Sequence, residues 1–235
     1  LTFNADGTMI CWIKYDESNV KEYSLQMFEG SHPTRSEYST YPGLYTYKYP
    51  KAGEVNAKVS AWAYDIQSHK TNRLQVPLDE DGYMPRIKST KDPAKIIVFT
   101  MNRHQDVLNL YAVNPRTTLS QLLIKEKADK YVKEESMEQV QIGAGSILLP
   151  SDRDGYMHLY EYTMNGTLKR KIGNGDFDIT EVYGFDEKTG DVYYQAASIN
   201  SHDRQVFVAH KNGKAERLTG KEGWNDAVFS GDFQY

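Results

Sequence analysis

Short runs of β-branched and aromatic residues alternate with turns rich in glycine, aspartate and asparagine along the whole chain. Such alternation is typical of short β-strands joined by tight turns, and helical periodicity is weak throughout. The most helix-like segment is 120–132, but its place in the repeat described next predicts a strand followed by a loop. The pattern therefore predicts an all-β protein.

Two features recur along the chain with the same period. A turn followed by an aromatic residue ends at Tyr83, Tyr131, Phe177 and Trp224, which are 48, 46 and 47 positions apart. A hydrophobic strand motif recurs in phase with it at 61–65, 110–114, 159–163 and 206–210. A shared period in the forties with strand-like content predicts β-propeller blades, each a four-stranded antiparallel sheet. We expect the four aromatic residues to hold equivalent, buried positions where successive blades begin.

The repeating unit is clearest in its third copy. There the pattern predicts strands at 179–185, 191–196, 205–210 and 216–218, with Asn212-Gly213 in the last hairpin turn. Asn-Gly favours such turns because both central residues adopt positive φ. Asn165-Gly166 holds the corresponding place one copy earlier.

The repeats divide the chain into one partial propeller domain, 1–235. We expect blades at 1–78, 83–125, 131–172 and 177–219, and the start of a further blade at 224–235, with a first strand at 227–230. Because the first and last units look incomplete, we expect about four to five blades of a larger propeller.

The first blade carries an insertion at about 17–57 that is rich in tyrosine. An insertion of this length is more than a connector. Two interpretations stay open: a β-hairpin arm that packs on its own propeller, or an arm that contacts a partner or a substrate.

Composition narrows the classes of partner. The 235 residues carry a formal net charge of −4 and contain no long basic run, so we expect no nucleic-acid partner. Cys11 is the single cysteine and lies in an apolar strand pattern, which predicts a buried, inert thiol rather than a nucleophile.

No catalytic constellation is recognisable, so we expect no catalytic residue, no cofactor and no metal site in this chain, and we assign no binding residue. Gly143-Ala144-Gly145-Ser146 lacks the final glycine of a nucleophile elbow. None of the six histidines is spaced from a second histidine or a cysteine as metal ligands are; they are His32, His69, His104, His158, His202 and His210.

Two acidic segments have simpler interpretations. Asp152-Arg153-Asp154-Gly155 lacks the distal acidic ligand of a calcium loop and predicts a surface turn. Glu134-Glu135 falls where a first strand is expected, so the two carboxylates should face opposite sides and form a poor shared site.

Several stretches resemble the β-propeller of the dipeptidyl peptidase IV family, in the form found in Bacteroidetes, and the likeness runs essentially from end to end. The Tyr-Pro-Lys-Ala-Gly element at 49–53 and the Asp-Gly-Tyr-x-His-Leu-Tyr motif at 154–160 are specific in combination. The other matching stretches are 14–20, 181–187 and 218–225.

The resemblance implies an eight-bladed propeller that caps an α/β-hydrolase domain. It implies a serine exopeptidase that removes an N-terminal dipeptide whose second residue is usually proline. The Ser, Asp and His of the triad would lie beyond Tyr235, and the paired glutamates that bind the substrate amino terminus would lie before Leu1. Glu134-Glu135 is not that pair, because its flanking residues do not match. The Phe-Arg loop of mammalian members would fall near 131–134, where the residues differ.

The resemblance thus implies that this chain is the non-catalytic part of a peptidase, gating substrate access and scaffolding the hydrolase domain. The implied partners are that hydrolase domain and peptides with a penultimate proline, and the implied location is the periplasm or cell envelope. A homodimer could form through the inserted arm or through open blade edges, and two copies could in principle close a ring. The alternative function is a stand-alone propeller-like module that binds peptide or glycan.

Overall fold

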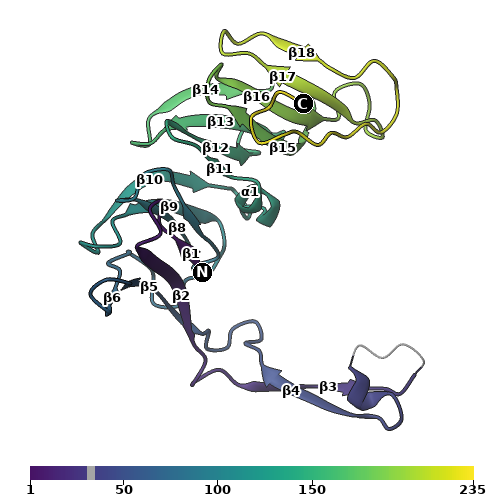
Figure 1. Ribbon diagram of the computed structural model, residues 1–235. Helices are drawn as coiled ribbons and strands as arrows, with labels where there is room; N and C mark the ends of the chain where they lie inside the picture. Colours follow the sequence, from purple (N-terminus) through teal and green to yellow (C-terminus); the bar gives the residue numbers. More distant parts are fainter. Residues whose placement is uncertain (31–34) are drawn as a thin grey trace.

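The computed structural model describes residues 1–30 and 35–235, and it contains four four-stranded antiparallel sheets (Figure 1). The first sheet consists of β1 (Thr2–Phe3), β2 (Met9–Asp16), β5 (Lys58–Asp65) and β6 (Lys70–Arg73). The second consists of β7 (Ile87–Ser89), β8 (Ile96–Met101), β9 (Val107–Val113) and β10 (Ser120–Lys127).

The other two sheets repeat the plan. The third consists of β11 (Gln141–Ile142), β12 (Ser146–Ser151), β13 (His158–Thr163) and β14 (Leu168–Ile172). The fourth consists of β15 (Ile179–Asp186), β16 (Asp191–Ala196), β17 (Gln205–Ala209) and β18 (Ala215–Arg217). In every sheet each strand pairs with the next strand of that sheet, as in a propeller blade. We therefore call the sheets blades 1 to 4.

The all-β, blade-type fold predicted from the repeat is confirmed. The third copy of the unit, now blade 4, has its four strands within two residues of the predicted bounds. Segment 120–127 is the strand β10, as its place in the repeat predicted, and not a helix.

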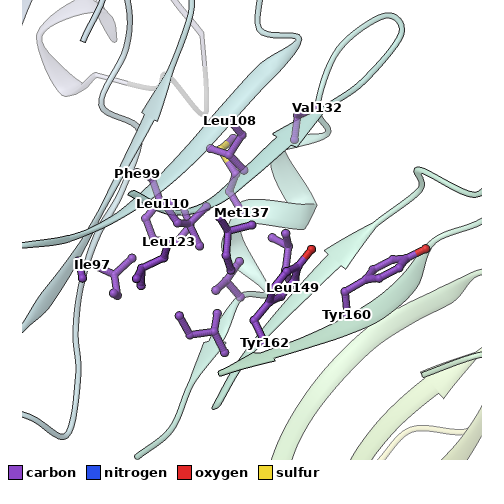
Figure 2. Packing of buried hydrophobic residues seen from close by; sticks show 14 of the residues in the cluster. Ile97, Phe99, Leu108, Leu110, Leu123, Val132, Met137, Leu149, Tyr160 and Tyr162 are labelled. Atoms are coloured by element: carbon purple, nitrogen blue, oxygen red, sulfur yellow. The ribbon is translucent and has the colours of Figure 1, made fainter. Parts of the chain in front are cut away.

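Apolar side chains fill the spaces between successive blades. One buried cluster joins β8, β9 and β10 of blade 2 to β12 and β13 of blade 3, and includes Phe99, Leu110 and Leu149 (Figure 2). Two similar clusters join blades 1 and 2 and blades 3 and 4. Each blade is therefore stabilised mainly by its neighbours, as in other repeat proteins.

Two local predictions are wrong. Residues 134–138 form the short helix α1 (Glu134–Glu138) instead of a first strand. Segment 224–235 contains no strand; Phe229 and Phe233 fold back instead on Tyr193 of β16, with ring centroids 4.8 and 5.1 Å away. The aromatic residues that suggested a strand are therefore used to cover the face of blade 4.

The inserted arm is a two-stranded hairpin of β3 (Glu22–Met27) and β4 (Gly43–Lys48) that projects away from the blades (Figure 1). Tyr23, Tyr45, Tyr47 and Tyr49 contact one another along it, with centroid distances between 5.3 and 6.2 Å. At its base, Arg103 of blade 2 donates to the Glu54 carbonyl at 3.1 Å. The interpretation that the hairpin packs on its own propeller is therefore wrong for residues 22–27 and 43–48, which the structure describes as projecting from the blades.

No helix among the described residues is long and apolar enough to cross a bilayer.

Candidate functional site

One end of the blades gathers the connections between blades and the loops that link second to third strands. We call this end the rim. After blades 2, 3 and 4, a backbone hydrogen bond joins the chain that leaves the blade to the loop before that blade's third strand. The bonds are Val132 N to the Gln105 carbonyl (2.8 Å), Ile179 N to the Met157 carbonyl (2.7 Å) and Arg204 N to the Gly223 carbonyl (3.1 Å). The repeat thus places the connections equivalently, and the arm emerges from the same end.

The four repeating aromatic residues differ in burial, although their chain positions correspond. Tyr83 bridges Met101 in blade 2, and Phe177 packs against the cluster between blades 3 and 4. Tyr131 and Trp224 are 60% and 68% exposed. The expectation that all four are buried is wrong: Tyr83 and Phe177 are only partly buried, and Tyr131 and Trp224 are exposed, because the connection crosses the end of the sheets and not the space between them. Trp224 instead lies under the Arg204 guanidinium, 4.7 Å from the ring centroid.

A pocket of about 340 Å³ opens at the rim between blades 1 and 2 and helix α1. Its lining is largely apolar and aromatic, with one carboxylate, and includes Tyr15, Tyr83, Met84, Tyr131, Glu134 and Met137. An apolar hollow with a few polar groups suits a small ligand or a peptide side chain.

Helix α1 holds its acidic residues against blade 2. The Arg86 guanidinium donates to Glu134 at 3.3 Å and to Glu138 at 2.6 Å. The Lys88 ammonium donates to the carbonyls of Glu138 (2.9 Å) and Val140 (2.7 Å), and burial lowers the pKa of Lys88. Glu134 and Glu135 therefore lie in the first turn of a helix, and the expectation that they face opposite sides of a strand is wrong.

Segment 152–155 forms the expected turn, but one of its side chains is part of the contact between blades. The Arg153 guanidinium pairs with the buried Glu126 of β10, donates to Tyr162 at 2.8 Å and lies 4.1 Å from the Tyr160 centroid. Asp154 accepts from the Tyr160 hydroxyl at 2.5 Å. Within the described residues, no group of three or more His, Cys, Asp or Glu side chains is placed to hold a metal ion.

Cys11 is fully buried, and burial raises the pKa of its thiol to about 11. A protonated, inaccessible thiol is a poor nucleophile.

In the described part of the chain, a serine hydroxyl approaches a histidine ring only between the neighbours Ser201 and His202, at 3.4 Å in an exposed loop. His32 lies outside the described residues. Acyl-transfer chemistry needs a nucleophile, a base and oxyanion donors in one place, and this arrangement does not supply them.

His158, at the start of β13, is only 2% exposed. Its ring meets the Phe177 ring edge-on, with centroids 5.8 Å apart. Among the described residues, neither ring nitrogen has a well-formed hydrogen bond. Burial and, to a smaller extent, Lys171 lower the pKa of His158, against weaker contributions from Asp154, the Gly175 backbone and Asp178. The neutral imidazole is therefore the form that fits between blades 3 and 4.

We expect this histidine to make the protein less stable in mild acid. The unfolded state binds a proton near pH 6.5, whereas the folded state resists it, so stability falls as pH drops below about 6.5. His158→Phe keeps the aromatic contact and should flatten the dependence of the unfolding midpoint between pH 7 and 5. The exposed His104→Gln should leave it unchanged. An identical pH dependence in wild type and His158→Phe would contradict this role.

A family model described as the dipeptidyl peptidase IV (DPP IV) N-terminal region matches residues 1–235. The chain belongs to this family. The resemblance drawn from the sequence is thereby confirmed, and the rim, arm and blades described above are features of a DPP IV N-terminal region.

Solved structures agree with this family. The chain is similar to Porphyromonas gingivalis dipeptidyl peptidase 4, with a TM-score of 0.88, 34% identity, and coverage of 98% of this chain and 32% of that one. A putative dipeptidyl aminopeptidase IV from Bacteroides ovatus has a similar fold, with a TM-score of 0.71, 20% identity, and coverage of 91% and 32%.

Curated relatives point the same way. Probable dipeptidyl-aminopeptidase B of Podospora anserina is 26% identical over 99% of this chain and 27% of its own length. The protein of the same description from Phaeosphaeria nodorum is 23% identical over 92% of this chain and 26% of its own. The chain thus spans between about a quarter and a third of the length of these relatives.

Sequence reasoning missed the rim pocket of this DPP IV N-terminal region, because its lining comes from five separate segments of the chain. Helix α1 did leave a signal. Glu134 and Glu135 lie in its first turn, where carboxylates interact favourably with the helix dipole.

Proposed function

We propose that this chain is the non-catalytic propeller part of a serine dipeptidyl peptidase, in which it gates substrate access and scaffolds an α/β-hydrolase domain of the same longer protein. The parent enzyme would release X-Pro dipeptides from the amino termini of peptides. The observation that carries the proposal is the family match over 1–235, together with the similarity to a dipeptidyl peptidase 4 structure of which this chain covers 32%.

The rim supports this assignment. It gathers an apolar pocket, exposed aromatic side chains such as Tyr131 and Trp224, and the loops that vary most between blades. An end with these properties can face a second domain and contact a peptide on its way to the active site.

The test is hydrolysis of a Gly-Pro chromogenic substrate. We expect the full-length protein to release the chromophore and to lose this activity with a serine-directed inhibitor, whereas the 235-residue chain alone shows no turnover. No activity in the folded full-length protein, or inhibitor-sensitive activity in the chain alone, would overturn the proposal. The first result would favour a stand-alone module that binds peptide or glycan.

We also propose that the arm joins two copies of the protein. It exposes Leu25, Phe28, Tyr41 and Leu44, which are 40%, 70%, 77% and 66% exposed, on a hairpin that projects from the blades. Projecting apolar surface of this kind is typical of interaction sites. Replacing Phe28, Tyr41 and Leu44 by serine should convert a dimer into a monomer in sedimentation velocity. A monomeric wild type at micromolar concentration would exclude this role.

A periplasmic or cell-envelope location completes the proposal, and the similarity to two bacterial dipeptidyl peptidase structures supports it. Recovery of the native protein in the cytosolic fraction of its own cells would contradict it.

A further inference from the structure

A pocket lined by four basic side chains lies away from the rim, at the opposite ends of blades 3 and 4. It has a volume of about 470 Å³. The end of β13, the strand β14 and the two turns of blade 4 at 187–190 and 210–214 enclose it. A volume of this size suits a small organic molecule better than a bare ion.

The walls of this pocket are held in place by internal bonds. The buried Glu161 accepts from Ser146 at 2.7 Å and from Arg170 Nε at 2.6 Å, and it pairs with Lys169. The other Arg170 nitrogens donate across to blade 4, to the carbonyls of His210 (2.7 Å) and Gly190 (2.8 Å). One guanidinium therefore joins the two blades and preorganises the pocket before any ligand arrives.

Two further cations line the pocket without such a partner. Lys188 and Lys211 lie in the two turns of blade 4, and within the described residues neither ammonium is within 4.0 Å of a carboxylate. The lining has four cationic side chains and two carboxylates, Glu161 and Glu187. Glu187 already accepts from the Ala144 backbone at 2.8 Å. The pocket therefore has an excess of positive charge for an anion to neutralise.

The pocket also has an apolar part. Phe185 and Val192 contribute to its lining, so a ligand could place a carbon skeleton there and its anionic group toward the lysines. Arg170 and Lys169 each keep N–H groups beyond those already bonded to Glu161, Ser146 and the two carbonyls. This combination fits a phosphate or sulfate group, which has several acceptor oxygens.

We propose that this pocket binds a phosphate or sulfate ester of a small sugar, at a site independent of peptide hydrolysis. Lys188 and Lys211 bind the oxyanion, Arg170 holds the two blades around it, and the sugar ring packs near Phe185. The charged group could come from an ester or from the free inorganic anion, and the probes below distinguish the two.

The test is isothermal titration of the full-length protein with glucose 6-phosphate, glucose 6-sulfate, glucose and inorganic phosphate. At least one of the two esters should bind saturably and weaken with added salt, and glucose should not bind. Lys188→Ala with Lys211→Ala should weaken ester binding by about tenfold or more, since two charge-assisted contacts are lost. Lys130→Ala with Lys221→Ala removes the same charge from exposed residues outside the pocket and should leave binding unchanged.

Several results would overturn the proposal. The proposal is wrong if neither ester binds saturably, or if the pocket double variant and the control double variant bind the ester equally well. It is also wrong if inorganic phosphate binds as tightly as the esters. The thermal unfolding midpoint of each double variant is measured as well and should be unchanged. If the alanine variant unfolds, Lys188→Arg with Lys211→Arg replaces it in the test; this variant keeps the charge and should still bind the ester. Because the readout is binding, it does not depend on whether the protein is a peptidase.

Discussion

Gly166→Ala should destabilise the protein by roughly 2–5 kcal/mol, from the left-handed backbone conformation and from overpacking. Gly166 has φ +84° in the turn between β13 and β14. A Cβ there would lie 2.1 Å from the Leu123 carbonyl oxygen of β10, in the neighbouring blade. Leu123 lies in a bulge of that strand. The atom that the new Cβ would meet belongs to the backbone, which cannot move aside as a flexible side chain could.

Gly213→Ala is the matched control for this clash. Gly213 occupies the corresponding turn of blade 4, with φ +87°, and a Cβ there would meet no atom within 4 Å. Gly213→Ala should lower the free energy of unfolding only by the strain of the left-handed backbone conformation, about 1 kcal/mol. Urea unfolding midpoints of the two variants compare them directly. Equal losses at Gly166 and Gly213 would show that the contact between blades 2 and 3 does not constrain Gly166.

Arg153→Ala should cost about 3–5 kcal/mol, because it leaves a carboxylate buried without its cation. That carboxylate is Glu126, whose side chain is 7% exposed between blades 2 and 3. The change also removes the donor to Tyr162 and the cation over Tyr160. Urea or thermal unfolding of the purified variant measures the loss.

Two comparisons separate the buried charge from a general effect of losing an arginine. Arg116 pairs with Asp65 at 2.8 Å but is 44% exposed, so Arg116→Ala should cost no more than about 1 kcal/mol. The double variant Arg153→Met with Glu126→Leu should recover most of the loss, because neither charge remains buried. If the double variant is as unstable as Arg153→Ala, the loss of stability comes from lost packing contacts and not from the buried charge.

The repeat made the blades predictable, because every blade has to bury the same alternating face against its neighbours. The strands of blade 4 and the strand β10 follow from turn residues and the period alone. Asn165-Gly166 and Asn212-Gly213 were equally clear as hairpin turns. The sequence could not distinguish them further, because only the packed structure places the Leu123 carbonyl against one of them.

The rim was harder to predict for a related reason. Tyr131 and Trp224 recur in phase with Tyr83 and Phe177, yet they are exposed, because periodicity locates a residue along the chain and does not fix what covers it. Helix α1 interrupts the expected first strand of blade 3 within a charged segment that has no alternation. The pockets combine residues far apart in sequence, so no local motif marks them.

We propose that this chain acts as a gate in a dipeptidyl peptidase. The most direct measurement compares two substrates with the same Gly-Pro amino terminus. One is a short unstructured peptide, and in the other the terminus belongs to a stably folded domain. The full-length protein should cleave the folded substrate roughly a hundredfold more slowly, since local opening at about 3 kcal/mol exposes few termini. Unfolding that domain should restore the rate. Equal kcat/KM for the two substrates would contradict a gating role for this propeller.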